Sequence, residues 1–360
     1  MKPIRILSMK LDLLGEVDNY LSFSISRKYY TYGEFHLVTN IKVQNADKLG
    51  VGNLIMIGSD EFKTGIIRHK EIKINEGGEE ILTVKGFTLS HFLRQRITIP
   101  LTGEARDTIE GNAETVVKHF VRRNCSDISG MEFPSFIVSP NLNRGDEIKW
   151  SSRYRNLAEE LEKISRLTDM AFMIYPDFEL KSYIFDIYNG RNFSASQNTS
   201  PPVIFSSKFD NVASQDYTDS LLDFGNYAMV AGQGEGVDRE ILMMGDEAAV
   251  GFDKSVIFVD ARDLEDSKDL PARGAAKLKE HERIVSFGAE VLTTGPFVYQ
   301  KDWDLGDIVT VQNKDWNVEV DTRITEVTEI YEAGGFRLNV VFGDEMLTLG
   351  EKIKREIKGI

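Results

Sequence analysis

The side chains that most often carry catalytic or metal chemistry are few and scattered in this sequence. Cys125 is the single cysteine, so no internal disulfide can form, and it stands six positions from His119, which on one helix would place the two side chains on different faces. The other histidines are at positions 36, 69, 91 and 281, with no pair four residues apart and no HExxH motif. We expect no zinc site, no metalloprotease helix and no thiol–histidine dyad.

Three glycines, Gly232, Gly234 and Gly236, follow a strand-like segment in the manner of a phosphate-binding loop. Phosphate binding there requires the N-terminus of a helix directly after the loop, because the free N–H groups of that turn hold the anion. Asp238–Met244 instead has the residue pattern of a strand. We therefore predict a hairpin loop and no cofactor-binding residue.

Asp302, Asp304 and Asp307 imitate the first ligands of a calcium loop. Such a loop has glycine at its sixth position and glutamate at its twelfth, whereas this sequence has Asp307 and Asn313 there. Turn-forming aspartates are the better interpretation, and Arg144-Gly145-Asp146 is likewise interpreted as a polar turn. No metal ligand is predicted.

Charge excludes some classes of protein. The chain has 57 acidic and 43 basic side chains and a net charge of -14, so it would repel a phosphate backbone, and no specific nucleic-acid binding is expected. It has no 18-residue apolar run and no uninterrupted signal core, so we expect no stable membrane insertion and synthesis in a cytoplasm. Among so many acids, carboxylate pairs suited to glycoside hydrolysis would arise by chance, and we predict no catalytic residue.

The elements that would position any site are mainly β-strands. Short strand patterns separated by turn signals fill the first hundred residues, at 22–26, 35–39, 54–57, 65–74 and 80–84. Strand patterns return at 224–230, 255–259 and 287–292, with a helix-forming stretch at 271–283 between the last two. The segment 192–202 is rich in Ser, Asn and Pro and is the best linker candidate.

Residues 101–200 have a different pattern, which indicates an α+β domain. Asn112 can cap a helix that ends near 124. Apolar residues recur at helical spacing from Tyr154 to Leu167, with Ser151 and Ser152 as candidate caps. Strand-like runs at 171–175 and 183–188 predict a hairpin after this helix.

These patterns predict a mainly β fold with an α+β insertion. We divide the chain into a first β domain (1–100), an α+β domain with two helices and a β-hairpin (101–200), a β segment returning to the β domains (201–245), a small mixed domain with a helix (246–286), a second β domain (287–347) and a C-terminal tail (348–360). That the two β domains are β-barrel domains is implied by the family resemblance given below.

An internal repeat links the two β regions. Gly65–Gly86 and Thr322–Gly343 are both 22 residues long, and the pairs Gly77-Gly78 and Gly334-Gly335 fall at the same place in each. A tight turn between long strands needs a positive φ, which glycine adopts without steric cost. The apolar alternation slips by one residue inside the first copy. The same hairpin is nevertheless predicted twice.

Aromatic side chains gather where strands meet loops, and they could serve as core or as interface. We favour the core for this group. Its members are Tyr29, Tyr30, Tyr32, Trp303, Trp316 and Tyr331.

Several segments together resemble the siphovirus ReqiPepy-type tail protein family. They are RKYYTYGEFHL (27–37), NYAMVAGQGEGVD (226–238), VDARDL (259–264), DLGDIV (304–309) and VFG (341–343), and they follow one another in the order of the family. That family is similar to the baseplate hubs of contractile tails and to the N-terminal part of tail-associated lysins. The resemblance implies a baseplate-hub-like fold with two related antiparallel β-barrel domains per subunit and a homotrimer.

This resemblance implies a structural, non-enzymatic protein of a virion tail or phage-like particle, such as a bacteriocin. It would join a tail-tube or distal tail ring protein to a spike, fibre or lysin at the tip, and the tape-measure protein is a further possible partner. The sequence does not separate contractile from non-contractile tails. Two alternatives stay open, a cell-wall glycan hydrolase and a host-surface carbohydrate-binding protein that would use Trp303 or Trp316.

Overall fold

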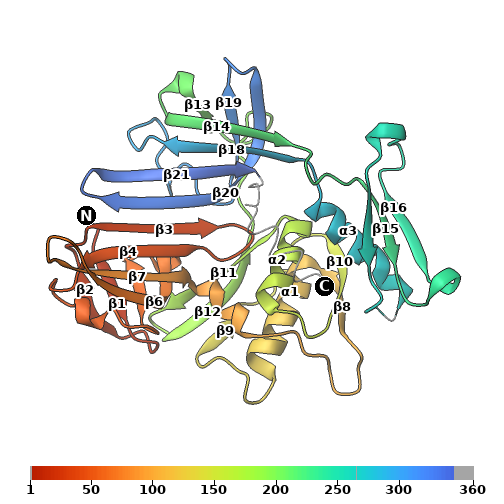
Figure 1. Ribbon diagram of the computed structural model, residues 1–360, viewed down its shortest axis with the longest axis horizontal. Helices are drawn as coiled ribbons and strands as arrows, with labels where there is room; N and C mark the ends of the chain where they lie inside the picture. Colours follow the sequence, from red (N-terminus) through yellow and green to blue (C-terminus); the bar gives the residue numbers. More distant parts are fainter. Residues whose placement is uncertain (1, 265, 344–360) are drawn as a thin grey trace. The chain divides into compact units, whose positions relative to one another are not determined.

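The computed structural model describes residues 2–264 and 266–343, so the predicted C-terminal tail lies outside the described residues. Contacts divide the chain into two compact units. Among the described residues, the first contains 2–189, 225–264, 266–281 and 328–336, and the second contains 190–224, 282–327 and 337–343. Figure 1 shows the elements of both units.

The first unit begins with an antiparallel sheet that we call the first β module. Its strands follow the order β3-β4-β7-β6-β5-β1-β2. Side chains alternate between core and solvent along β4, as expected for a sheet with one face on a core. The bounds of the strands are β1 Ile4–Leu7, β2 Leu13–Val17, β3 Ser22–Lys28, β4 Glu34–Asn40, β5 Leu54–Ile57, β6 Thr64–Ile74 and β7 Glu80–Thr88.

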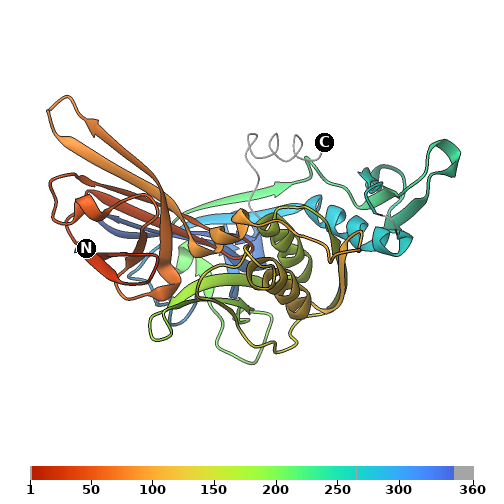
Figure 2. The same ribbon diagram turned by 90° about the horizontal axis from the view of Figure 1, so that it is seen from below.

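Strands β6 and β7 form a long hairpin that projects from this module (Figure 2), and β7 also pairs with β4 along Ile81–Phe87. Gly78 at its turn has a φ of 78°, which confirms the role predicted for the glycine pair. The pairing register shifts between Ile67 and His69. A β-bulge therefore lies in the stretch where the apolar alternation slips.

An α+β domain follows in the same unit. Helix α1 (Ala113–Arg122) begins at the predicted cap, because the Asn112 side chain accepts a hydrogen bond from Thr115 N at 2.9 Å. Helix α2 (Leu157–Thr168) is capped by Asn156 instead of Ser151 or Ser152, which belong to a strand, so that prediction was wrong. The strands are β8 Asp107–Asn112, β9 Phe136–Val138, β10 Glu147–Ser152, β11 Ala171–Asp177 and β12 Ser182–Tyr188.

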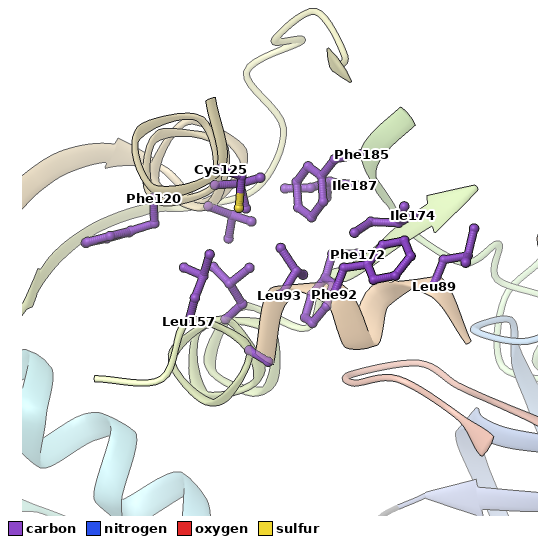
Figure 3. Close-up of a cluster of buried hydrophobic side chains, with 14 of the residues drawn as sticks. Leu89, Phe92, Leu93, Phe120, Cys125, Leu157, Phe172, Ile174, Phe185 and Ile187 are labelled. Atoms are coloured by element: carbon purple, nitrogen blue, oxygen red, sulfur yellow. The ribbon is translucent and has the colours of Figure 1, made fainter. Parts of the chain in front are cut away.

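The core of the α+β domain lies between its helices and strands. Phe120 from α1 and Leu157 from α2 share this cluster with Phe172 and Phe185 from the predicted β11–β12 hairpin (Figure 3). The apolar faces that the sequence shows at helical spacing are the faces buried here.

The last part of the first unit is a small three-stranded sheet with one helix. Its strands, in the order β16-β15-β17, are Ile241–Gly245, Tyr227–Ala231 and Val256–Asp260. Helix α3 (Leu270–Glu280) packs against it, and Ala228, Val230 and Val259 form their shared core with Leu270. We call these residues the β15–β17 subdomain.

The second unit contains most of a second β module. Its strands follow the order β14-β18-β21-β20, and β19 connects β20 to β13. The bounds are β13 Ile204–Ser206, β14 Val212–Ser220, β18 Ile284–Val291, β19 Ile308–Asn313, β20 Val318–Glu332 and β21 Gly335–Gly343. The predicted linker 192–202 holds no helix or strand and only one isolated bridge, at Asn192.

The internal repeat extends beyond the hairpin. The order β3-β4-β7-β6-β5-β1 of the first module matches β14-β18-β21-β20-β19-β13 of the second, strand for strand. Gly335 has a φ of 115° and occupies the position of Gly78 in the other hairpin. One difference is direction, because β1 is antiparallel to β5 whereas β13 is parallel to β19. The prediction that one hairpin occurs twice is confirmed.

The mainly β class is confirmed, but two closed barrels are not found among residues 2–264 and 266–343. Barrel closure requires the first and last strands of a sheet to pair. In the first module the outermost strands are β3 and β2, and the pairing found for β2 is with β1. Within the described residues both modules are therefore open sheets, antiparallel except for the parallel pairing of β13 with β19.

We predict that Phe120→Ala lowers the free energy of unfolding by about 3–5 kcal/mol, because it empties a fully buried site in the α+β core. Urea unfolding followed by circular dichroism measures the change. The matched control is Phe209→Ala, whose side chain is exposed, and a change within about 0.5 kcal/mol is expected there. Equal losses in both variants would contradict this account of the core.

Candidate functional site

The structure does not assemble the histidines and the cysteine into a reactive site. Cys125 is buried, and burial raises the pKa of its thiol to about 12, so it stays a neutral thiol at physiological pH. His119 Nε2 lies 2.8 Å from Asp107 Oδ1, a contact that ties α1 to β8. In the described parts of the chain, no three His, Cys, Asp or Glu side chains are arranged to hold a metal ion.

The aspartates that imitate a calcium loop act within turns and ion pairs. Asp307 is buried, and its carboxylate accepts hydrogen bonds from the backbone N of Arg191 at 2.8 Å and from Nη2 of Arg191 at 2.7 Å. The backbone N of Asp304 donates to Oδ2 of Asp307 at 2.9 Å. Asp302 accepts from Val298 N at 2.7 Å. These contacts agree with turn-forming aspartates.

The glycine run forms a hairpin loop, as predicted. Gly232 N donates to Glu240 O at 2.8 Å, so the two ends of the loop are bonded to each other. Gly234 has a φ of 96°, and a Cβ there would lie 2.4 Å from Asp238 O. The loop leads into β16 and not into an α-helix, which leaves no helix N-terminus for a phosphate.

A buried network of charges holds the start of α1. Glu114 is fully buried and binds Arg144 Nη2 and Lys118 Nζ through Oε1 at 2.9 and 2.6 Å. Lys118 also donates to Asp186 at 3.1 Å. Arg144 of the Arg-Gly-Asp segment thus makes an internal ion pair, in keeping with a structural turn. Burial alone would raise the pKa of Glu114, but the hydrogen bonds from Arg144 and Lys118 outweigh it and lower the pKa to about 2.

A second network joins the β15–β17 subdomain to the α+β domain. Asp263 accepts hydrogen bonds from Arg273 at 3.1 Å and from Arg106 at 3.3 Å, and Arg155 lies 3.8 Å away. Burial would raise the pKa of Asp263, whereas Arg273 and the other two arginines lower it, and the net direction is down. Asp263 belongs to the segment VDARDL, so this segment connects the β15–β17 subdomain to the α+β domain through its ion pairs.

A third joint fixes the turn of the β20–β21 hairpin, residues 328–336, within the first unit. Glu329 is buried, and its Oε1 lies 2.6 Å from Lys63 Nζ, which is also buried and is 3.2 Å from Asp60. Tyr331 donates to Oε2 of Glu329 at 2.6 Å and contacts the ring of Phe23, with centroids 6.2 Å apart.

The predicted preference of the aromatic side chains for the core is confirmed at three positions. Tyr29, Trp303 and Tyr331 are buried. Trp316 is 47% exposed and is not part of the core. Of the two tryptophans proposed for carbohydrate binding, Trp303 is inaccessible and Trp316 is exposed.

The outer face of the β15–β17 subdomain is an exposed apolar surface that sequence reasoning missed. Met243, Met229 and Phe258 stand side by side across the three strands, and the Phe258 side chain is 61% exposed. Ile241 and Val256 extend the same face. A signal was present, because strands apolar at nearly every position indicate burial on both faces, and only α3 covers one of them. Contiguous apolar side chains of this kind are uncommon on the surface of a folded chain.

Within the described residues, no helix has the length and apolar character that crossing a membrane requires. The ion pairs described above are structural contacts between parts of the chain, and the outer face of the β15–β17 subdomain is apolar and exposed. The residues singled out from the sequence do not come together as a catalytic centre.

Three solved tail proteins share this fold. The tail protein from Neisseria meningitidis MC58 is 13% identical, with a TM-score of 0.59 over 96% of this chain and 97% of that one. The 43 kDa tail protein of prophage MuSo2 from Shewanella oneidensis is 11% identical, with a TM-score of 0.58 over 95% and 98%. The prophage tail protein gp18 from Listeria monocytogenes EGD-e is 8% identical, with a TM-score of 0.55 over 99% of each chain. At these identities the likeness shows the fold alone.

In sequence, the family model described as Siphovirus ReqiPepy6 Gp37-like protein matches residues 3–344. No curated protein matches the chain.

We predict that acid removes the contribution of Glu114 to stability. Its pKa in the folded protein, about 2, lies below the ordinary value of 4.5, so the stabilisation is complete above about pH 4.5 and is lost as the pH falls through 2. At pH 7 Glu114→Gln should cost on the order of 3 kcal/mol, and the difference from wild type should shrink towards pH 2. Urea unfolding at several pH values measures it, with the exposed Glu104→Gln as control. A cost that does not change with pH would contradict the ion-pair account.

We predict that Asp263→Asn loosens the β15–β17 subdomain while the first β module keeps its stability. Loss of the charged acceptor weakens the bonds from Arg273 and Arg106, so amide hydrogen exchange across β15–β17 and α3 should accelerate roughly tenfold or more. Mass spectrometry of exchanged peptides measures it, with exposed Asp238→Asn as control. Unchanged protection in Asp263→Asn would show that the arginine cluster does not hold the joint.

Proposed function

Because the chain belongs to the Siphovirus ReqiPepy6 Gp37-like family, we propose that it is a structural baseplate hub protein of a phage tail or a phage-derived injection particle. Three copies would form a ring that connects the tail tube to the tip. The observation that carries this proposal is the repetition of one six-strand order in both β modules. Three chains with two such modules present six similar units, which fits a three-fold tip to a six-fold tube.

The fold supports a role in a tail. The three solved tail proteins resemble this chain over nearly their whole length as well as its own, so the likeness includes the modules and the domain inserted between them. In this proposal the two related modules correspond to the barrel domains expected from the sequence, completed by neighbouring subunits in the ring.

The proposed partners are a tail-tube or distal tail ring protein on one side and a spike, fibre or lysin on the other. The exposed apolar face of the β15–β17 subdomain supports contact with one of these tail proteins, since desolvating Met229, Met243 and Phe258 would supply binding energy. A net charge of -14 supports the passage of DNA or a tape-measure protein through such a ring without adhesion.

A non-enzymatic role is part of the proposal. The thiol is buried, the histidines are dispersed, and Glu114, whose pKa is lowered to about 2, is held by two cations inside the protein. The contacts of Glu114 are structural.

The proposal predicts that the protein is present in the particle as three copies at the tail tip. Cross-linking of purified particles should give a species of three times the 40.7 kDa chain, and a gold label on the chain should lie at the tip in electron micrographs. A label along the tail shaft, or release of sugars from peptidoglycan by the purified chain, would contradict the hub role.

The same assay tests the apolar face. Met229→Asp with Phe258→Asp should fold but fail to enter particles, because two charges would have to be desolvated at the interface. The control is Leu142→Asp, whose side chain is 65% exposed in a loop outside this face. Normal incorporation of the double variant would remove the apolar face from the proposed interfaces.

A further inference from the structure

Strand β6 extends well beyond its neighbour β5. The pairing of β5 with β6 covers only Thr64–Ile66 of β6. From Arg68 to Ile74, a segment that we call the β6 arm, the strand pairs with β7 on one side, and no strand is found on its other side among the described residues. Ile72 and Ile74 in this arm are 49% and 70% exposed. A long free edge with apolar side chains is a template for pairing with another strand.

The corresponding part of the second module is not left open. Strand β20 pairs with β19 only through Val318–Arg323. Its later part, 328–332, belongs to the first unit, and β3 is the next strand of the sheet there. Glu329 and Tyr331, the counterparts of Ile72 and Ile74, are 1% and 5% exposed. This arm is therefore covered by a strand at the edge of the other module.

The counterpart of β3 in the second module is β14, because both are the outermost strand of the repeated order. Strand β14 pairs with β18 along Val212–Ser220. No strand is found at its other edge in the described parts of the chain. In the described residues, the end of β20 is thus covered by β3. The β6 arm and the outer edge of β14 have no neighbouring strand.

We infer that the β6 arm of one copy adds to the open edge of β14 of a second copy. This contact would repeat between chains the one that residues 328–332 of β20 make with β3 within a chain. The inference that this contact closes a ring rests on the proposed function. Backbone hydrogen bonds would be satisfied along both edges, and Ile72 and Ile74 would be buried as their counterparts already are.

Charge favours this pairing over the alternatives. The β6 arm carries Arg68, Lys70 and Lys73 against one acid, Glu71, which lies 3.0 Å from Lys73, so the arm keeps a net positive charge; β14 carries Asp216 and Asp219 and no base. Opposite charges on facing strands stabilise a pairing, and like charges oppose it.

In the contact within the chain, Glu329 of β20 is held by Lys63, and Tyr331 lies against Phe23 of β3. The β6 arm has isoleucines at these two positions and an excess of basic side chains, which the acids of β14 would attract. Each copy would give one arm and accept one, a head-to-tail arrangement that closes into a ring when the rotation permits.

The test combines charge reversal with cross-linking in the full-length chain. Lys70→Glu with Lys73→Glu should weaken self-association on the order of tenfold or more, measured by analytical ultracentrifugation. Adding Asp216→Lys to that variant restores opposite signs and should recover association. Asp216 is chosen because Asp219 already accepts a hydrogen bond from Arg283. The control is the exposed Lys268→Glu, and circular dichroism checks that each variant folds.

A photo-reactive amino acid at position 74 provides the second readout. Cross-links to 212–220 of another copy, identified by mass spectrometry of mixed light and heavy chains, are the expected result. A trimer that survives charge reversal, or cross-links elsewhere, would overturn this inference and leave the proposed function standing. Cross-links to 212–220 in an assembly that is not a trimer would support the strand pairing and count against the trimeric hub. A chain without cross-links at any concentration, in solution and in particles, would overturn both.

Discussion

Carboxylates taken out of water must meet a cation, and this requirement fixes the joints of the molecule. An isolated buried carboxylate costs several kcal/mol, so its partner has to be in place for the fold to form. Glu114 is held by Arg144, Asp307 by Arg191 and Glu329 by Lys63, each from a distant part of the chain. The chain has 57 acidic and 43 basic side chains, so not every carboxylate can have its own basic partner, and the buried carboxylates are among those that do.

The same joints give physical meaning to the segments by which the sequence resembles its family. In RKYYTYGEF, Tyr30 donates to Asp169 at 2.7 Å, and a Cβ on Gly33 would lie 1.8 Å from Ser26 O, so the chain turns there only with glycine. VDARDL contributes Asp263 to its arginine cluster, and DLGDIV contributes Asp307. These segments connect elements to one another. At Tyr30, Gly33, Asp263 and Asp307 the residue type is explained by a hydrogen bond, a close backbone approach or an ion pair.

Helix caps and turns, which depend on neighbouring residues, were predictable from the sequence. Contacts between distant residues were not, except for the second β hairpin, which the internal repeat predicted. The Asn112 cap and the glycine turn at Gly78 depend on neighbours a few residues away, and both were correct. The cap of α2 was wrong because Ser151 and Ser152 pair in a strand, which propensity does not reveal. The arginine cluster at Asp263 joins residues more than a hundred positions apart and leaves no local pattern.

The expectation of closed barrels failed for a related reason. Periodicity predicts strands and which face is apolar, but closure depends on which edges pair, and edge pairing is set by residues remote in sequence. The apolar outer face of the β15–β17 subdomain was missed because apolar residues on both faces of a strand are normally evidence of burial.

The two hairpins of the repeat show how one framework can serve two environments. Both keep a glycine turn and the same neighbours in the sheet, since these depend on backbone geometry. They differ in the side chains near the turn, where residues 328–332 of β20 place Glu329 and Tyr331 inside the protein and the β6 arm exposes Ile72 and Ile74. An ion pair that must find one lysine suits a contact within a chain, where the partner is always present. In the β6 arm the isoleucines are flanked by lysines, which keep the free chain hydrated there. In the proposed contact the isoleucines would be buried and the lysines would face the acidic side chains of β14.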